Sequence, residues 1–110
     1  MAQNFRRYTS NNVGTVAATI MTANSYDAVV GISLSNVHTS AINVSCYIND
    51  CSNDIYLVKD APLPVGSSLQ VLDGGAKLVL DGTTSDALKV VSDTASSCDV
   101  WVSAVDDIST

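Results

Sequence analysis

Glutamate is absent from this sequence, and histidine, proline and the basic residues are scarce: one His, two Pro and five Lys and Arg in 110 residues. All eleven acidic residues are therefore Asp, and the formal net charge is −6. A broad phosphate-binding surface requires clustered Lys and Arg, so this balance opposes a nucleic-acid partner. A single histidine also argues against catalysis by a nucleophile with a base held by a third group.

Long apolar runs are missing as well. The first thirty residues contain no apolar stretch after a basic start of the kind a secretory signal needs, and no run approaches the roughly 18 apolar residues of a membrane span. We therefore expect a soluble, unsecreted protein with no membrane partner. The three cysteines are an odd number, which argues against a disulfide framework and favours a reducing compartment.

The residues that are abundant favour strands. The chain has fifteen Val, fifteen Ser and nine Thr. Asp, Ser and Thr compete with a helical backbone for its hydrogen bonds, whereas β-branched side chains pack well on a pleated surface. The length suits one domain with a single modest core.

Alternation with a period of two predicts strands over residues 14–22, 26–36, 41–49 and 97–107. In 26–36 it places Ala28, Val30, Ile32 and Leu34 inward, with Val29 outward. The strand over 41–49 is expected to return as the antiparallel partner of 26–36, with an inward set of Ile42, Val44, Cys46 and Ile48.

The stretch 54–92 contains short apolar runs separated by Pro, Gly and Asp-Gly breaks, which is typical of a strand meander. The runs are 55–58, 69–72, 78–80 and 88–91. The whole pattern predicts an all-β domain, an antiparallel β-sandwich or jelly roll of eight or nine short strands over residues 11–110. Residues 1–10 are expected to form an N-terminal arm.

Metal sites find little support in the sequence. Cys46 and Cys98 alternate with apolar residues and are expected in the core, whereas Cys51 lies in a turn. His38 and Cys51 flank the strand 41–49, which separates them by about nine residues at roughly 3.3 Å each. The acidic turn 50–54 lacks the alternating oxygen ligands, the central Gly and the closing Glu of a calcium loop. We expect no metal and no cofactor.

Catalytic patterns are equally weak. Gly74-Gly75 lies between two predicted strands rather than before a helix, so it does not resemble a phosphate-binding loop. The aspartates fall mainly in turns and on polar faces, where a catalytic carboxyl with a raised pKa is not expected. We therefore predict that the chain is not an enzyme.

Contacts with other chains are the remaining candidates for function. Arg6 and Arg7 form the only basic spot and belong either to a solvated terminus or to an arm that pairs with a neighbour's aspartates. Trp101 falls on the face shared with polar residues, where it caps the core edge or contacts another chain. The candidate docking residues are Phe5, Arg6, Arg7, Tyr8 and Trp101.

Three stretches resemble a known protein family: MAQNFRRYTSNNVGT, YLVKDAPLPVGSSLQVLDGGAKLVL and DALKVVSDTASSCDVWVSAVDDIST. Together they cover nearly the whole chain, and the most specific piece is 56–68. The sequence resembles short virion proteins of tailed bacteriophages, especially marine phages of cyanobacteria. The resemblance implies a non-enzymatic β-sandwich that is present in multiple copies on the particle.

From this resemblance we expect a capsid decoration or cement protein that binds the shell through its arm and a sandwich face. Its partners would be the major capsid protein or other virion proteins. Because such proteins commonly sit at lattice symmetry axes as homo-oligomers, we expect a trimer. We also expect the protein to reside in the virion, which assembles in the host cytoplasm. The alternatives are a tail, neck, baseplate or fibre-base structural component and, third, a carbohydrate-binding adhesion module.

Overall fold

A computed structural model describes residues 4–23, 26–72 and 77–109. These residues form nine strands and no helix, which confirms the predicted all-β sandwich. The strands are β1 (Asn4–Val13), β2 (Ala18–Thr22), β3 (Tyr26–Asn36), β4 (Ile42–Asn49), β5 (Asp54–Leu63), β6 (Ser68–Gln70), β7 (Leu78–Leu80), β8 (Ala87–Ser92) and β9 (Cys98–Ser109).

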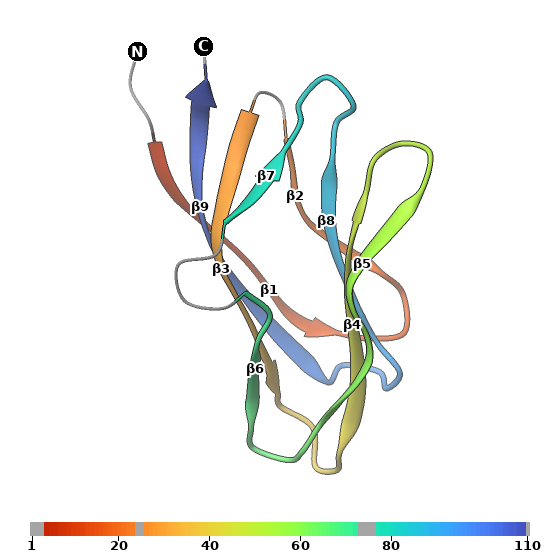
Figure 1. Cartoon of the computed structure of the whole chain (residues 1–110). Coiled ribbons are helices and arrows are strands. Elements are labelled where there is room, and N and C mark those ends of the chain that lie inside the picture. The colour runs from red at the N-terminus through yellow and green to blue at the C-terminus, as the bar shows by residue number, and fades with distance from the viewer. Residues whose placement is uncertain (1–3, 24–25, 73–76, 110) are drawn as a thin grey trace.

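Two antiparallel sheets pack face to face (Figure 1). The larger sheet has the order β1-β9-β3-β6, and β7 pairs with β3 beside β6. β7 covers the first half of β3 and β6 the second half. The smaller sheet has the order β2-β8-β4-β5. Apolar side chains from the facing surfaces make one core between the sheets.

The first segment of the chain is part of the larger sheet. From Asn4 onward, the residues expected to form an arm pair with β9 in antiparallel register, from Asn4 opposite Asp106 to Ser10 opposite Val100. β1 is thus an edge strand instead of a polar extension. The strand β1 was not predicted because Arg6, Arg7 and the Asn pair at 11–12 interrupt the apolar alternation that marks a half-buried strand.

Two predicted pairings are wrong. β4 does not return beside β3: β3 pairs with β9, β6 and β7, whereas β4 lies in the other sheet between β8 and β5. The stretch 54–92 is not a meander, because β5 and β8 belong to the smaller sheet and β6 and β7 to the larger one. Turn signals mark where strands end, but they do not say to which sheet the chain goes next.

The inward pattern of β4 is confirmed, because Ile42, Val44, Cys46 and Ile48 are all buried. The pattern of β3 is wrong in its first half. Register shifts near Tyr26 and Val29 mark bulges, and Val29 is fully buried while Val30 is 40% exposed. An extra residue in one strand reverses the phase of alternation, which a strict period of two cannot anticipate.

The edge strand β5 shows how the smaller sheet is protected from pairing with other chains. It is interrupted by bulges opposite Cys46, and Asp60 has a positive φ of 51°. The Asp60 N–H donates to the Ser45 hydroxyl, 2.9 Å away, and Pro62 lies two residues on. Bulges and proline are devices that keep an edge strand from accepting another strand.

Candidate functional site

The pairing of β1 with β9 divides the predicted docking residues between the two faces of the larger sheet. Phe5 and Arg7 lie on the outer face, which is the face turned away from the smaller sheet, because they alternate along β1 with Tyr8, which packs against the core. Arg6 and Tyr8 lie on the inner side, where Tyr8 packs against the core. Trp101 is on the outer face, because its position alternates with the buried residues Val100 and Val102.

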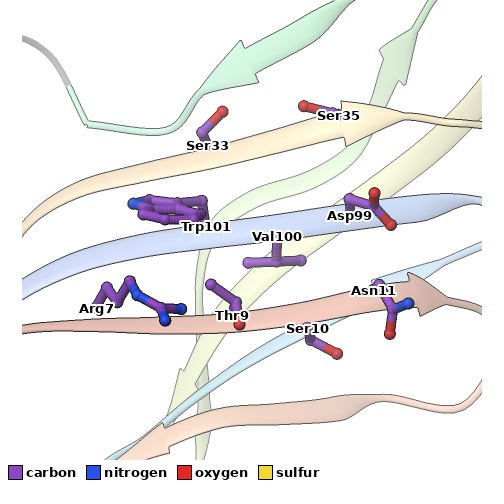
Figure 2. Close-up of a pocket in the computed structure, with 9 residues that line it drawn as sticks. All are labelled: Arg7, Thr9, Ser10, Asn11, Ser33, Ser35, Asp99, Val100 and Trp101. Carbon is purple, nitrogen blue, oxygen red and sulfur yellow. The ribbon is translucent and has the colours of Figure 1, made fainter.

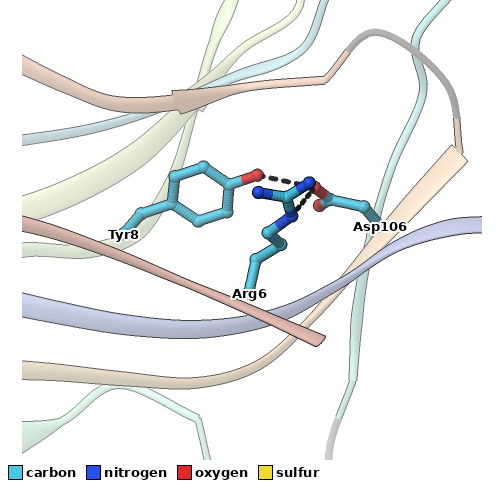
Figure 3. A network of polar contacts seen from close by, with 3 residues as sticks. All are labelled: Arg6, Tyr8 and Asp106. Atoms are coloured by element: carbon cyan, nitrogen blue, oxygen red, sulfur yellow. Dashed lines mark hydrogen bonds and ion pairs between the residues drawn. The ribbon is translucent and has the colours of Figure 1, made fainter. Parts of the chain in front are cut away.

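Arg6 and Tyr8 both contact the carboxylate of Asp106 on β9 (Figure 3). The Tyr8 hydroxyl donates to Asp106 Oδ2 over 2.8 Å, and Arg6 Nε lies 3.6 Å from the same oxygen. Burial, followed by this hydrogen bond, raises the pKa of Tyr8 to about 12. These contacts tie β1 to β9 within the chain, so their first role is structural.

Phe5 belongs to an apolar row that crosses the larger sheet. It lies opposite Val105, which lies opposite Ala28, which lies opposite Val79. Residues that face each other in antiparallel strands point to the same side, so the four form one stripe on the outer face. The two ends of the row are exposed, Phe5 at 82% and Val79 at 59%, whereas Val105 and Ala28 between them are buried.

The apolar row lies at one end of the sandwich. The start of β1, the end of β9, the start of β3 and β7 meet there (Figure 1). The exposed side chains of Tyr26 and Val30 belong to the same part of β3. The exposed apolar side chains at this end make it a candidate interaction surface.

Trp101 lines a hollow farther along the same face (Figure 2). Thr9 on β1 and Ser33 on β3 lie directly opposite it, and its side chain is half exposed. The hollow has a volume of about 460 Å³. Strands β1, β9 and β3 provide its lining, which includes Arg7, Thr9, Asn11, Ser33, Ser35, Asp99 and Trp101.

Charge of both signs borders this hollow. The Arg7 guanidinium carbon lies 5.3 Å from the centre of the Trp101 ring, a cation–π arrangement. At the other end, the Asn12 N–H donates to Asp99 Oδ1 over 2.9 Å and orients that carboxylate. The hollow therefore combines an aromatic surface, donors and an acceptor.

The cysteines lie where the sequence places them. Cys46 and Cys98 are buried, and burial raises their pKa to about 12 and about 11. Cys51 is exposed in the β4–β5 turn, where its thiol donates to the Thr84 carbonyl over 3.0 Å. Within the described residues, no group of three or more His, Cys, Asp or Glu side chains could hold a metal ion.

No helix in the described part of the chain is long and apolar enough to cross a membrane. The acidic turn after β4 is a hairpin tip, in which Asp50 Oδ1 accepts hydrogen bonds from the N–H groups of Ser52 and Asn53. These bonds lower the pKa of Asp50. Its carboxylate is thus used to close the turn.

The sequence is matched by no protein-family model and by no curated protein. Among solved structures, the fold is similar to a chain of the T13 IBDV viral particle, with a TM-score of 0.50 and 12% sequence identity. The similarity covers 94% of this chain and 31% of the viral chain, so this chain spans about a third of that protein's length. At this identity the likeness is one of fold.

Sequence reasoning named Phe5, Arg7 and Trp101 but missed what joins them. The apolar row and the hollow exist only because three strands that are distant in sequence share one register. The one available signal was parity: Phe5, Arg7 and Thr9 alternate with Arg6 and Tyr8. Once 4–13 is known to be a strand, that parity puts the first three on one face.

Proposed function

We propose that this chain is a non-enzymatic virion structural protein of a tailed bacteriophage, and specifically a capsid decoration protein. The proposal is supported by the sequence resemblance described above and is compatible with the viral fold neighbour. The observation that carries it is the apolar row on the outer face, whose two ends, Phe5 and Val79, are exposed to solvent.

In this proposal the end of the sandwich that carries the apolar row docks on the shell. Covering Phe5 and Val79 removes apolar surface from water, at about 25 cal/mol per Å². Arg7, two residues after Phe5 on β1 and part of the lining of the hollow, supplies a positive charge beside the apolar contact. The partner surface is therefore expected to be apolar with an acidic margin, on the major capsid protein or on another virion protein.

Docking by one end suits the shape of the domain. Its principal extents are 45, 28 and 20 Å, and the β3–β4 connection lies at the end opposite the apolar row (Figure 1). A domain that stands on one end projects its far end from the particle. Contacts between copies around a symmetry axis would add stability, because assembly favours the folded state by mass action.

The experiment is incorporation of variants into particles. Phe5→Ser combined with Val79→Ser is expected to lower the bound copies per particle at least about tenfold, which corresponds to about 1.4 kcal/mol. Val65→Ser is the matched control, because Val65 is 56% exposed but lies in the β5–β6 turn. Circular dichroism of the free proteins establishes that all variants are folded.

Full incorporation of the double variant would contradict docking through the apolar row. The wild-type copy number from the same preparations separates a decoration protein from a tail or neck component. The copy number of a decoration protein matches the number of lattice points on the shell, whereas the copy number of a tail component matches the subunits of a single ring.

A further inference from the structure

Trp101 is the chain's only tryptophan, and its indole stands at the middle of the outer face. Figure 2 shows the ring nearly edge-on between Arg7 from β1 and Ser33 from β3. Arg7 covers one side of the ring, at 5.3 Å from its centre. On the other side Ser33 is small, so that side of the indole is available to a flat apolar surface.

Gly31 lies opposite Ser103, two register positions from the Ser33–Trp101 pair and on the same face. A glycine inside a strand weakens the strand and often marks a place where a ligand or another backbone approaches closely. Its φ is not positive, and a Cβ at this position would meet nothing within 4 Å. Gly31 follows the register shift after Val29, and a bulge is one reason for a glycine in a strand. The missing side chain also leaves the surface beside the hollow open.

The polar lining of the hollow matches hydroxyl groups. Asp99 offers carboxylate oxygens, Asn11 an amide, and Thr9, Ser33 and Ser35 hydroxyls that both donate and accept. Gln70 Nε2 donates to the Ser33 hydroxyl over 3.2 Å, which orients that group. Such a set of small groups around one aromatic ring suits a ligand with several hydroxyls and one apolar face.

Other ligand classes fit less well. A nucleotide could stack on the indole and place its phosphate near Arg7, but Asp99 in the same lining and the net charge of −6 oppose an anionic ligand. A lipid would leave the polar lining without partners, which costs free energy. A pyranose ring presents C–H groups on one face and hydroxyls around its edge, so it satisfies both parts of the hollow.

We propose that the Trp101 hollow binds a neutral saccharide, whose C–H face packs on the free side of the indole and whose hydroxyls bond to Asp99, Asn11 and the β3 serines. This goes beyond docking on a shell. Phe5 is two residues, about 7 Å, from Arg7, which is the nearest β1 residue in the lining of the hollow. Phe5 and Val79 are not part of that lining, so the hollow and the apolar row are adjacent but distinct surfaces.

The test is a saccharide titration of the full-length protein that uses the intrinsic fluorescence of Trp101. The probes are N-acetylglucosamine trimer, cellotriose, maltotriose and lactose, and adenosine monophosphate serves as the stacking control. At least one saccharide is expected to shift the emission to shorter wavelength, with a Kd on the order of 1 mM for so small and open a site. A printed glycan array gives an independent readout.

Variants of residues in and beside the hollow test whether the saccharide binds there. Asp99→Asn and Gly31→Gln are each expected to weaken binding at least about fivefold, the first by altering the acceptor and the second by filling the open surface. Trp101→Phe keeps an aromatic ring and is expected to retain more binding on the array than Trp101→Ala. Val65→Ala, away from the hollow, leaves binding unchanged.

Two results would overturn the proposal. One is the absence of any array hit together with no fluorescence change at about ten times the expected Kd. The other is an equal response to adenosine monophosphate and to the saccharides, which would make the hollow a general stacking surface. Loss of particle binding in the Phe5 and Val79 variants would bear on the docking proposal alone, because these residues lie outside the hollow.

Discussion

The two faces of β9 are built from the same twelve residues but have opposite properties. On the inner face, Cys98, Val100, Val102 and Ala104 are almost completely buried. On the outer face, Asp99 borders a hollow and Trp101 is 52% exposed. The inner face is explained by the packing of this chain on itself, whereas the outer face carries an aromatic ring that this packing does not require.

In a small β-sandwich, residues that core packing does not explain are the better candidates for function. Core positions are selected for burial, and their identity follows from the fold. An exposed tryptophan, an exposed phenylalanine and an unpacked glycine each cost something in an isolated domain. Phe5, Gly31 and Trp101 all lie on the outer face of the larger sheet, which is the face used by both proposals above.

The largest expected effect is a break of the inner face. Leu34 on β3 is fully buried in the core, and Leu34→Ala is expected to cost about 3 kcal/mol of unfolding free energy through lost burial and a cavity. Its neighbour Ser33 points to the outer face, and Ser33→Ala is expected to change stability by less than about 0.5 kcal/mol. Urea unfolding followed by circular dichroism measures both, and equal losses would contradict the division of the two faces.

The inner face also makes stability depend on pH. Burial raises the pKa of the Cys46 thiol to about 12 and that of Cys98 to about 11, from an ordinary value of 9.0. Because the folded pKa values lie above the unfolded ones, the folded state holds these protons longer. The stability they contribute is complete below pH 9 and is lost as the pH rises through 11 and 12.

Urea midpoints between pH 8 and 11, measured with a reductant, test this alkaline loss. Cys98→Ala is expected to make the decline shallower, whereas the exposed Cys51, as Cys51→Ser, is expected to leave it unchanged. A decline of the same slope in the Cys98→Ala protein would show that the buried thiols are not its source.

The sequence predicts the buried residues of some strands better than those of others. The inner set of β4 follows from strict alternation, and Cys46 and Cys98 were correctly assigned to the core. Alternation failed in β3, where a bulge exchanges Val29 and Val30. Such bulges depend on the pairing with β9, which the local sequence does not encode.

The site was predictable only in part. Phe5, Arg7 and Trp101 stood out as exposed or unusual residue types, but the sequence assigned the first two to an arm. The apolar row needs Val79 and Ala28 in one register with Phe5, and no local pattern reports that a three-residue strand such as β7 joins β3. Non-local pairing is a property of the whole sandwich, so it emerges only from the structure.

The smallest expected effect concerns the outer face. Gly31→Ala is expected to raise the unfolding free energy by about 0.5–1 kcal/mol, since alanine loses less backbone entropy on folding and its Cβ meets no atom within 4 Å. Thermal and urea unfolding measure the change. A clear destabilisation would mean that the glycine serves the fold, and it would weaken the argument that the outer face is shaped for a ligand.

The most direct test of the central claim is a density map of the intact particle into which this domain can be placed. We expect Phe5 and Val79 to be covered by the shell, and the Trp101 hollow and the β3–β4 connection to face solvent. A map in which the apolar row faces solvent and another surface of the sandwich makes the contact would contradict it.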